Sequence, residues 1–202
     1  MRIAVASGKG GTGKTTVAVN LALSLEGDVC LADCDVEEPN DHLFLDVKMD
    51  TQEPVTVPVP VVNKEACTGC KLCVDFCEYN ALAMVATDVL VFENLCHGCG
   101  GCARFCPEKA ISERDRQIGI VETGTLDSLY FCHGRLDIGE VLAPPLIQAV
   151  QGKIPSEYTT IVDSPPGTTC STVKAVTAAD YCILIAENTT FGYHDANLDI
   201  EA

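Results

Sequence analysis

Positive charge is scarce in this sequence. Its 202 residues include 13 lysines and arginines against 29 aspartates and glutamates, which gives a formal net charge of −16 at pH 7. Nucleic-acid binding relies on clustered cationic side chains, so this balance argues against nucleic acid as the main partner. It suits docking to basic proteins, or serves solubility alone.

Long apolar runs are also missing. No stretch reaches the roughly 20 residues of a membrane-spanning helix, and the first apolar stretch leads straight into a glycine-rich loop, unlike a signal peptide. We therefore expect a cytoplasmic chain without a membrane span. Because 47% of the residues are hydrophobic, the chain can bury the core of one domain, or of one domain with a small insert.

The glycine-rich loop, GKGGTGKT, fits the phosphate-binding pattern G-x-x-x-x-G-K-[ST]. A strand-like run, RIAVA, precedes it, and TTVAVNLALSLE follows with apolar residues at helical spacing. Backbone N–H groups of such a loop and the N-terminus of its helix bind phosphate; the alternative is a glycine-rich turn without a ligand. The predicted nucleotide-binding residues are Gly8, Lys9, Gly10, Gly11, Thr12, Gly13, Lys14, Thr15 and Thr16.

Two lysines occupy this loop, although phosphate binding needs only one. By the motif, Lys14 reaches the β- and γ-phosphates and the Thr15 hydroxyl binds Mg²⁺. Lys9 is left without a role inside a single subunit.

Cysteine is abundant, with 13 residues, which in a chain with a nucleotide loop indicates metal in a reducing cytoplasm rather than disulfides. Eight of them form two copies of C-x2-C-x2-C-x3-C, beginning at Cys67 and Cys96. In such a pair of runs, three thiolates bind one iron–sulfur cube and the fourth crosses to the other. We therefore predict two [4Fe–4S] clusters, one on Cys67, Cys70, Cys73 and Cys106 and the other on Cys96, Cys99, Cys102 and Cys77.

The segment 62–114 resembles the bacterial two-cluster ferredoxin domain along its length. Pro107 follows the last cysteine of the second motif, whereas Glu78 takes that place in the first. The negative charge of Glu78 would lower the reduction potential of the nearby centre without removing a ligand. Zinc is the alternative metal, but zinc sites usually pair two short C-x2-C knuckles.

Residues 1–61 and 115–202 predict a single α/β domain around this insert. The runs DVCLAD and YTTIVD are strands that end in acids, YCILIA is a third buried strand, and IGEVLAPPLIQAVQG is a helix that ends at Gly152. Strands that alternate with helices predict a P-loop NTPase-type, doubly wound parallel sheet, which binds ligands at the carboxyl ends of its strands. Prolines within 57–60 mark the entry to the insert, and ERDRQIGIVETG marks the exit.

Together these motifs resemble the MinD/ParA/nitrogenase-iron-protein class of P-loop ATPases, and within it the MinD-superfamily ATPases with an inserted ferredoxin domain. The loop has the deviant Walker A pattern K-G-G-x-G-K-[ST] of that class, DCDVEEPN is similar to its switch I, and DSPPG to its switch II. The resemblance covers essentially the whole chain. It also relates the nucleotide-binding domain to that of cobyrinic acid a,c-diamide synthase.

The resemblance implies roles for four further side chains. Lys9 would reach the nucleotide of the other subunit, which implies an ATP-sandwich homodimer. Asp35 would orient or activate the attacking water, Asp33 would lie near the Mg²⁺ region, and Asp163 would hold Mg²⁺ through water. The alternative for the two switch I acids is a solvated turn.

Five cysteines lie outside the two motifs. Cys30 and Cys182 fall in apolar strand runs and are expected in the core. Cys170 lies seven residues past Asp163, where the nitrogenase iron protein has a ligand to a cluster shared by two subunits. A third site of this kind would need Cys132 as its second ligand; a buried or redox-sensitive thiol is the alternative.

We predict an ATPase whose nucleotide cycle gates electron transfer through two clusters. An ATP-dependent iron–sulfur carrier or assembly scaffold is the alternative; an amidating ligase fits less well, because nothing here resembles a glutaminase half. ATP rather than GTP rests on the resemblance, and the redox or cluster-accepting partner is unknown. Relatives continue past ENTTFGYHDANL, so we expect a C-terminally truncated or naturally short chain.

Overall fold

The computed structural model describes residues 1–192, 194 and 200. Two compact units are present. The larger consists of Met1–Val55, Gly119–Ile138 and Ala143–Ala202, and the smaller of Thr56–Ile118 and Gly139–Leu142. Two of the boundaries between them fall inside long strands, β3 (Lys48–Val62) and β6 (Ile111–Leu126), so each of these strands has residues in both units.

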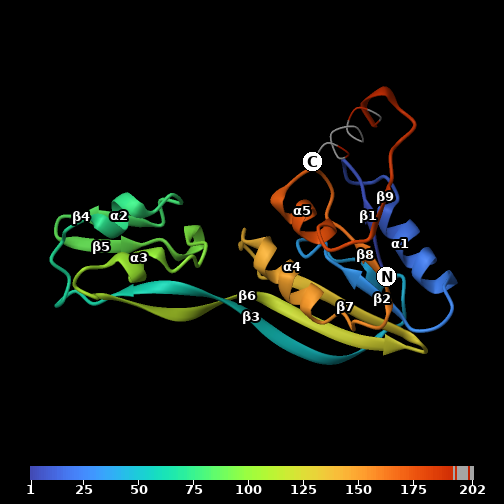
Figure 1. Cartoon of the computed structure of the whole chain (residues 1–202), viewed down its shortest axis with the longest axis horizontal. Helices are drawn as coiled ribbons and strands as arrows, with labels where there is room; N and C mark the ends of the chain where they lie inside the picture. Colours follow the sequence, from blue (N-terminus) through green and yellow to red (C-terminus); the bar gives the residue numbers. More distant parts are fainter. Residues whose placement is uncertain (193, 195–199, 201–202) are drawn as a thin grey trace. The chain divides into compact units, whose positions relative to one another are not determined.

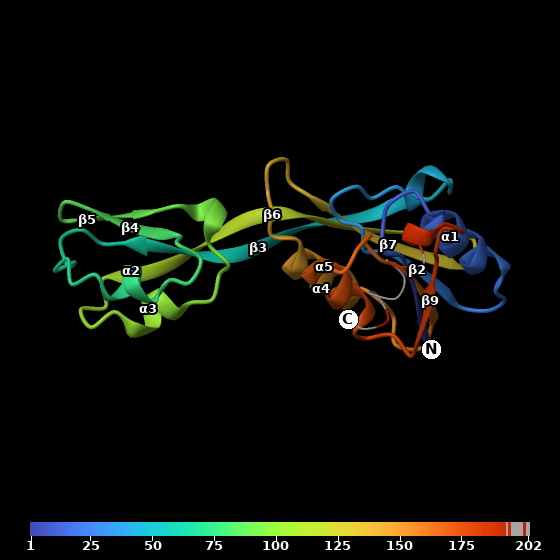
Figure 2. The ribbon, with the colours of Figure 1, turned by 90° about the horizontal axis from the view of Figure 1, so that it is seen from above.

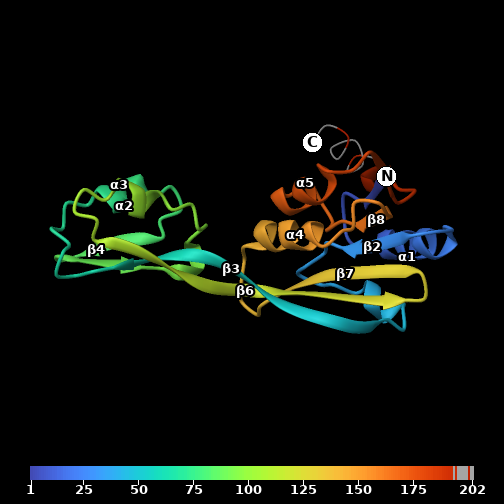
Figure 3. The ribbon, with the colours of Figure 1, turned by 60° about the horizontal axis from the view of Figure 1, so that its bottom comes forward.

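Seven strands form one sheet in the order β3-β6-β7-β2-β8-β1-β9. Five of them are short: β1 (Arg2–Ala6), β2 (Val29–Asp33), β7 (Leu129–Leu136), β8 (Thr159–Asp163) and β9 (Tyr181–Leu184). These five pair in parallel, whereas β6 runs antiparallel to β7 beside it (Figure 3). The expected parallel α/β sheet is therefore confirmed for these five strands, and an antiparallel pairing extends it on one side.

Helices cover both faces of the parallel strands. In Figure 1, α1 (Lys14–Ser24) lies on one side of them, and α4 (Ala143–Gly152) and α5 (Cys170–Val176) lie on the other. The predicted helix ending at Gly152 is confirmed. Each of these three helices connects two parallel strands: α1 connects β1 to β2, α4 connects β7 to β8, and α5 connects β8 to β9. The loops at the carboxyl ends of β1, β2 and β8 therefore lie along one edge of the sheet.

Apolar side chains of the central strands form the core beneath α1. Leu31, Phe131 and Ile161 are fully buried and lie in register on β2, β7 and β8. They pack with Ala18, Val19 and Ala22 of α1. On the other face, Gly134 of β7 lets α4 approach closely, since a Cβ there would lie 2.9 Å from a Val150 methyl. These contacts set the position of the loop before α1.

The smaller unit contains two short helices and a hairpin. The helices α2 (Leu72–Phe76) and α3 (Gly101–Phe105) lie side by side, near the antiparallel strands β4 (Leu82–Val85) and β5 (Asp88–Val91) (Figure 2). The structure also has two 3-10 turns, η1 (Asp41–Leu43) in the larger unit and η2 (Glu93–Leu95) in the smaller.

The sequence repeat is also a repeat of backbone conformation. Left-handed φ values occur in matching pairs, at Gly69 and Gly98 (70° and 64°), at Lys71 and Gly100 (66° and 71°), and at Asn80 and Lys109 (52° and 50°). Each member of a pair lies 29 positions from the other, the same interval that separates the two cysteine motifs. The two motifs therefore fold as two copies of one loop–helix–turn.

Two segments expected as linkers are strands. The prolines at Pro58 and Pro60 lie within β3, and ERDRQIGIVETG lies within β6. Strand β3 is at the edge of the sheet and has a neighbouring strand on one side only. A proline, which has no N–H to donate, is tolerated there when it faces the side without a neighbour. Within the described part of the chain, no helix combines the length and apolarity needed to cross a membrane.

Candidate nucleotide site and cysteine sites

The glycine-rich loop joins β1 to α1 at the carboxyl edge of the sheet. Gly11 and Gly13 have φ values of 80° and 89°, which side-chain-bearing residues rarely adopt. No heavy atom lies within 4 Å of the position that a Cβ would take at Gly10, Gly11 or Gly13. The loop therefore leaves open space along its glycines and begins α1 at Lys14.

Hydrogen bonds tie this loop to the DSPPG segment after β8. The Gly167 N–H donates to the Ser7 carbonyl at 2.8 Å. Both the N–H and the hydroxyl of Ser164 donate to the Val5 carbonyl, at 3.1 and 2.8 Å. A change in the conformation of DSPPG would therefore act directly on the start of the phosphate loop.

Three predicted residues meet at the base of the loop. The Thr15 hydroxyl donates to Asp163 Oδ2 at 2.7 Å, and Lys14 Nζ lies 3.6 Å from Asp163 Oδ1. Both Lys14 and Asp163 are buried, and Asp163 Oδ1 accepts no hydrogen bond among the described residues. Mg²⁺ prefers hydroxyl and carboxylate oxygens, so Thr15 and Asp163 fit an Mg²⁺ ion that would take the place of their mutual hydrogen bond. Thr12 Oγ1 in the same loop is also buried without a partner in the described chain, as a phosphate-binding hydroxyl would be before its ligand arrives.

The two switch I acids differ in environment. Asp33 is fully buried and accepts three backbone N–H groups, those of Asp35, Asn40 and Asp41, at 3.0–3.2 Å. Burial, and after it the Asp163 charge, raises the pKa of Asp33 to about 7. Asp33 therefore organises the turn, which is not a solvated one. Asp35 is only partly buried; its burial raises its pKa to about 6, although the Lys14 ammonium opposes the shift.

Asp41 belongs to this group and was not singled out from the sequence. It is fully buried, and its two oxygens accept no hydrogen bond from the described residues. Burial, followed by the charges of Asp33 and Asp163, raises its pKa well above the ordinary aspartate value. The available signal was the run of acids after β2, in which a third aspartate follows the first two.

The second lysine of the loop contacts its own chain. Lys9 Nζ lies 2.5 Å from Glu187 Oε2, and each side chain is 38% exposed. Glu187 lies beyond β9, and no short motif in the sequence pairs it with Lys9.

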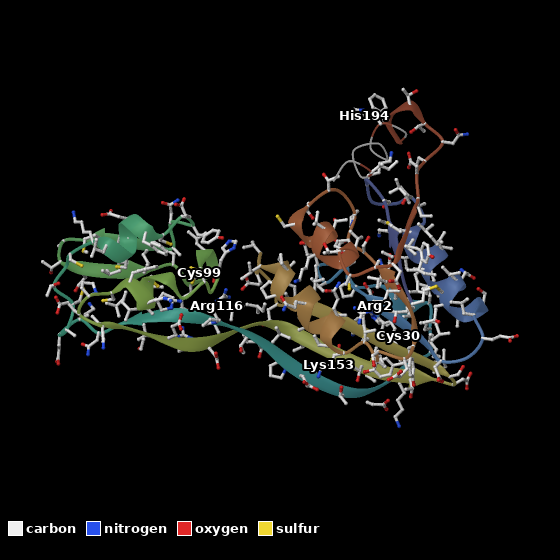
Figure 4. The ribbon with its side chains drawn as sticks, in the orientation of Figure 1. Arg2, Cys30, Cys99, Arg116, Lys153 and His194 are labelled. Atoms are coloured by element: carbon white, nitrogen blue, oxygen red, sulfur yellow. The ribbon has the colours of Figure 1, made fainter. Side chains whose placement is uncertain are left out.

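The cysteines of the two motifs line two cavities in the smaller unit. Cys77, Cys96, Cys99 and Cys102 line a cavity of about 390 Å³. Cys67, Cys70, Cys73 and Cys106 line a narrower one of about 20 Å³. Each cavity thus takes three cysteines from one motif and the fourth from the other, the same grouping as the expected ligand sets; in Figure 4, Cys99 lies on the loop before α3. Binding of iron and sulfide by them stays a prediction.

The fourth cysteine of each motif accepts an equivalent backbone hydrogen bond. The Ala81 N–H donates to Cys77 Sγ and the Ala110 N–H to Cys106 Sγ, both at 3.3 Å.

Among the described residues, no group of three or more His, Cys, Asp or Glu side chains could hold a metal ion. Burial raises the pKa of Cys102 to about 11, so metal binding there has to release a thiol proton.

The remaining cysteines differ from expectation in one case. Cys30 is buried as predicted, but Cys182 is exposed. The expectation that YCILIA forms a third buried strand is wrong: β9 is the last strand of the sheet, and three of its four residues are exposed. Cys170 is exposed at the first residue of α5, whereas Cys132 is fully buried with its thiol directed at the Val150 carbonyl. A buried thiol cannot supply a ligand at a subunit surface, so Cys132 does not support a third, shared metal site.

Comparison with known proteins gives a consistent result. The sequence model of a family described as the CobQ/CobB/MinD/ParA nucleotide-binding domain matches residues 3–190. Two uncharacterized proteins of Methanocaldococcus jannaschii are similar: MJ0578, 33% identical over 96% of this chain and 70% of its own length, and MJ0579, 30% identical over 97% and 72%.

Two solved structures share the fold. One is the septum site-determining protein MinD of Pyrococcus horikoshii complexed with Mg-ADP, at 18% identity and a TM-score of 0.50; the other is the cell division ATPase MinD of Pyrococcus furiosus, at 20% and 0.50. Each match covers 99% of this chain, which spans 64% and 65% of the respective MinD chains.

Proposed function

Because the chain belongs to the CobQ/CobB/MinD/ParA nucleotide-binding family, we propose that it binds and hydrolyses ATP with Mg²⁺. We propose further that it carries two [4Fe–4S] clusters and that the nucleotide cycle of a homodimer gates electron transfer through them. The observation that carries this proposal is the crossed grouping of eight cysteines around two cavities, in one chain with a phosphate-binding loop.

Nucleotide binding is supported by three features of the larger unit. The open glycine loop, the buried Thr12 hydroxyl and the buried Lys14 ammonium are the donors that a triphosphate needs. Thr15 and Asp163 would hold Mg²⁺, since the Thr15 hydroxyl and the buried Asp163 carboxylate are in direct contact.

Hydrolysis requires a group that positions water beside the γ-phosphate. Asp35 is the candidate, because it is only partly buried and lies close enough to Lys14 for the ammonium to lower its pKa. Asp33 cannot take this role while it accepts three backbone N–H groups. The role of Asp35 is to orient the water and accept its proton.

We propose two clusters, rather than two single ions, because each cysteine motif has the spacing of a ferredoxin. The thiolates of a zinc site converge on one ion at about 2.3 Å, whereas those of a cube are spread around four irons. The cavity of about 390 Å³ that Cys77, Cys96, Cys99 and Cys102 line leaves room for a group larger than a single ion. A bound cluster supplies one-electron redox chemistry. The chain contributes the N–H groups of Ala81 and Ala110, whose hydrogen bonds to ligand sulfurs would stabilise the reduced state.

An ATP-dependent iron–sulfur carrier or assembly scaffold is the second candidate. One cysteine of each set is solvent-exposed, Cys70 in one and Cys99 in the other. An exposed ligand could be replaced by a thiol of an acceptor protein. Release of clusters to an apo-ferredoxin only when ATP is present would favour the carrier, and retention through many nucleotide cycles would favour electron transfer.

Anaerobic purification followed by iron, sulfide and EPR measurement tests the proposal. We expect about eight irons and eight sulfides per chain, an EPR signal after dithionite reduction, and Mg²⁺-dependent ATP hydrolysis. Zinc in place of iron, or iron without sulfide, would contradict the cluster assignment. If the purified protein binds ATP but contains no iron, the proposed nucleotide binding is supported and the proposed clusters are contradicted.

A further inference from the structure

The contact between Lys9 and Glu187 links the phosphate loop to the segment after β9. Both partners are held in place by their backbones. The Ser7 hydroxyl donates to the Lys9 carbonyl at 2.8 Å, and the Ile185 N–H donates to the Ala6 carbonyl at 2.8 Å. The Thr189 N–H then donates to the Glu187 carbonyl, also at 2.8 Å. The ion pair therefore joins two ordered segments rather than two free side chains.

The two lysines of the loop are in contrasting environments. Lys14 is buried beside Asp163, but Lys9 is 38% exposed and its ammonium is paired with the Glu187 carboxylate. In this conformation Lys9 is bound within its own subunit. A lysine that serves the nucleotide of another subunit has to leave this carboxylate first.

We propose that Glu187 is a positioning residue for Lys9, which retains the ammonium on its own subunit until nucleotide phosphates compete for it. This inference rests on the proposed function, in which ATP forms a dimer and Lys9 reaches across it. The nucleotide-free chain is then restrained from premature dimerisation, because dimerisation has to break this ion pair in both subunits.

The strength of the contact suits a restraint that ATP can remove. A partly exposed ion pair typically changes an equilibrium by about 1.4- to 5-fold, and salt weakens it. A symmetric dimer breaks two such pairs, so the effect on the dimer dissociation constant is squared, to about 2- to 25-fold. A triphosphate carries more negative charge than one carboxylate, and it therefore competes successfully for Lys9.

The test compares Glu187→Gln with the wild type by sedimentation, using a non-hydrolysable ATP analogue and Mg²⁺. We expect the variant to dimerise about 2- to 25-fold more tightly at low salt, with the difference shrinking as salt rises. Glu53→Gln is the matched control, because it breaks a similar ion pair of the larger unit, Lys153 to Glu53 at 2.7 Å, away from the loop. A purely structural role of Glu187 would not give this salt-dependent tightening.

A Lys9→Ala background separates the inference from general effects. There, Glu187→Gln should leave nucleotide affinity unchanged, since the restrained group is gone. An unchanged dimer constant in the Glu187→Gln chain that has Lys9 would overturn this inference and leave the proposed function standing. If neither the wild type nor Glu187→Gln dimerises, both this inference and the proposed homodimer are wrong. Iron content and ATP hydrolysis would still test the proposed clusters and the proposed ATPase activity.

Discussion

Individual side chains at the nucleotide site have separable roles. Lys14 is a buried cation at the phosphate loop, and Asp35 is a partly buried acid beside it. Lys14→Ala should weaken ATP binding by roughly 100-fold, because a charge-assisted contact to phosphate is lost. Asp35→Asn should bind ATP normally but hydrolyse it about 100- to 10,000-fold more slowly, since the group that accepts the proton is removed. Equilibrium binding and single-turnover hydrolysis measure the two effects, and an equal loss of binding in both variants would contradict the assignment.

The raised pKa of Asp35 predicts a pH dependence of hydrolysis. Burial raises this pKa to about 6, so the carboxylate is protonated below that pH and cannot accept a proton from water. The single-turnover rate should therefore fall as the pH drops below about 6, whereas ATP binding should be affected less. The residual activity of Asp35→Asn should lack this acid limb. An acid limb that persists in the variant would assign it to another group.

Asp41 is expected to make the free energy of unfolding depend on pH. Its pKa in the folded protein is raised, so the folded chain retains a proton that the unfolded chain releases above the ordinary value of 3.8. Stability contributed in this way is present at low pH and is lost as the pH rises toward the folded pKa. Asp41→Asn should thus flatten the pH dependence and stabilise the nucleotide-free protein at pH 8 by about 1 kcal/mol or more.

Denaturant unfolding at pH 5 and pH 8 measures this prediction. Asp46→Asn is the control, because it removes the same charge from an exposed position. Similar changes in the two variants would mean that the effect comes from the net charge of −16 rather than from the buried carboxyl of Asp41.

At the scale of elements, the smaller unit is two copies of one loop–helix–turn that exchange a cysteine. The helices α2 and α3 each end directly before the fourth cysteine of their motif. Phe76 and Phe105, the last residues of the two helices, are in contact with ring centroids 4.9 Å apart. A Cβ on Gly101 would lie 2.1 Å from the Phe76 ring, so the absence of a side chain there permits this packing. The contact of the helices is what sends each fourth cysteine to the cavity of the other motif.

Pairs of cysteine substitutions test this exchange. If Cys77 and Cys99 bind the same cluster, Cys77→Ser with Cys99→Ser should remove one cluster, about half of the iron. Cys77→Ser with Cys70→Ser should remove both clusters, although these two cysteines belong to one motif. Iron analysis and the EPR signal of the reduced protein distinguish the cases. If each cluster were instead bound by the four cysteines of one motif, the pair Cys77 and Cys70 would remove one cluster and the pair Cys77 and Cys99 would remove both. Cys170→Ser should leave the iron content unchanged.

At the scale of the whole molecule, two strands are common to both units. The boundary in β3 falls after Val55 and the boundary in β6 after Ile118, within continuous strands. The switch I residues precede β3 in the chain, and DSPPG follows β8. The segment that carries the cysteines is therefore joined covalently to the unit with the phosphate loop through both strands.

If the two proposed clusters are present, we expect ATP affinity to depend on their redox state. Thermodynamic linkage requires that reduction change ATP affinity by the same free energy by which ATP changes the reduction potential. A coupling of about 1.4 kcal/mol would give a tenfold difference in affinity, equivalent to about 60 mV for a one-electron couple. Nucleotide titrations of oxidised and dithionite-reduced protein measure it. Identical affinities in a protein that dimerises with ATP would show that the two units function independently.

Local patterns in the sequence were sufficient for much of this description. The phosphate loop, the strands that end at Asp33 and Asp163, and the helix that ends at Gly152 follow from spacing within short windows. The conformation of a turn or a helix depends mainly on neighbouring residues, so such windows contain the information. The long strands β3 and β6 were missed because their prolines and charged residues are typical of linkers, and only the pairing of the strands shows otherwise.

The tertiary structure alone decided some long-range contacts. The meeting of Thr15 and Asp163, 148 positions apart, was expected from the family resemblance, whereas no sequence motif pairs Lys9 with Glu187. Asp41 became part of the site only because the turn after β2 buries it beside Asp33 and Asp163. Burial and long-range contact depend on how the whole sheet is ordered, and no local window records that order. The sequence by itself therefore determined the phosphate loop and the cysteine spacing, and the packing of the strands determined the charges that act on that loop.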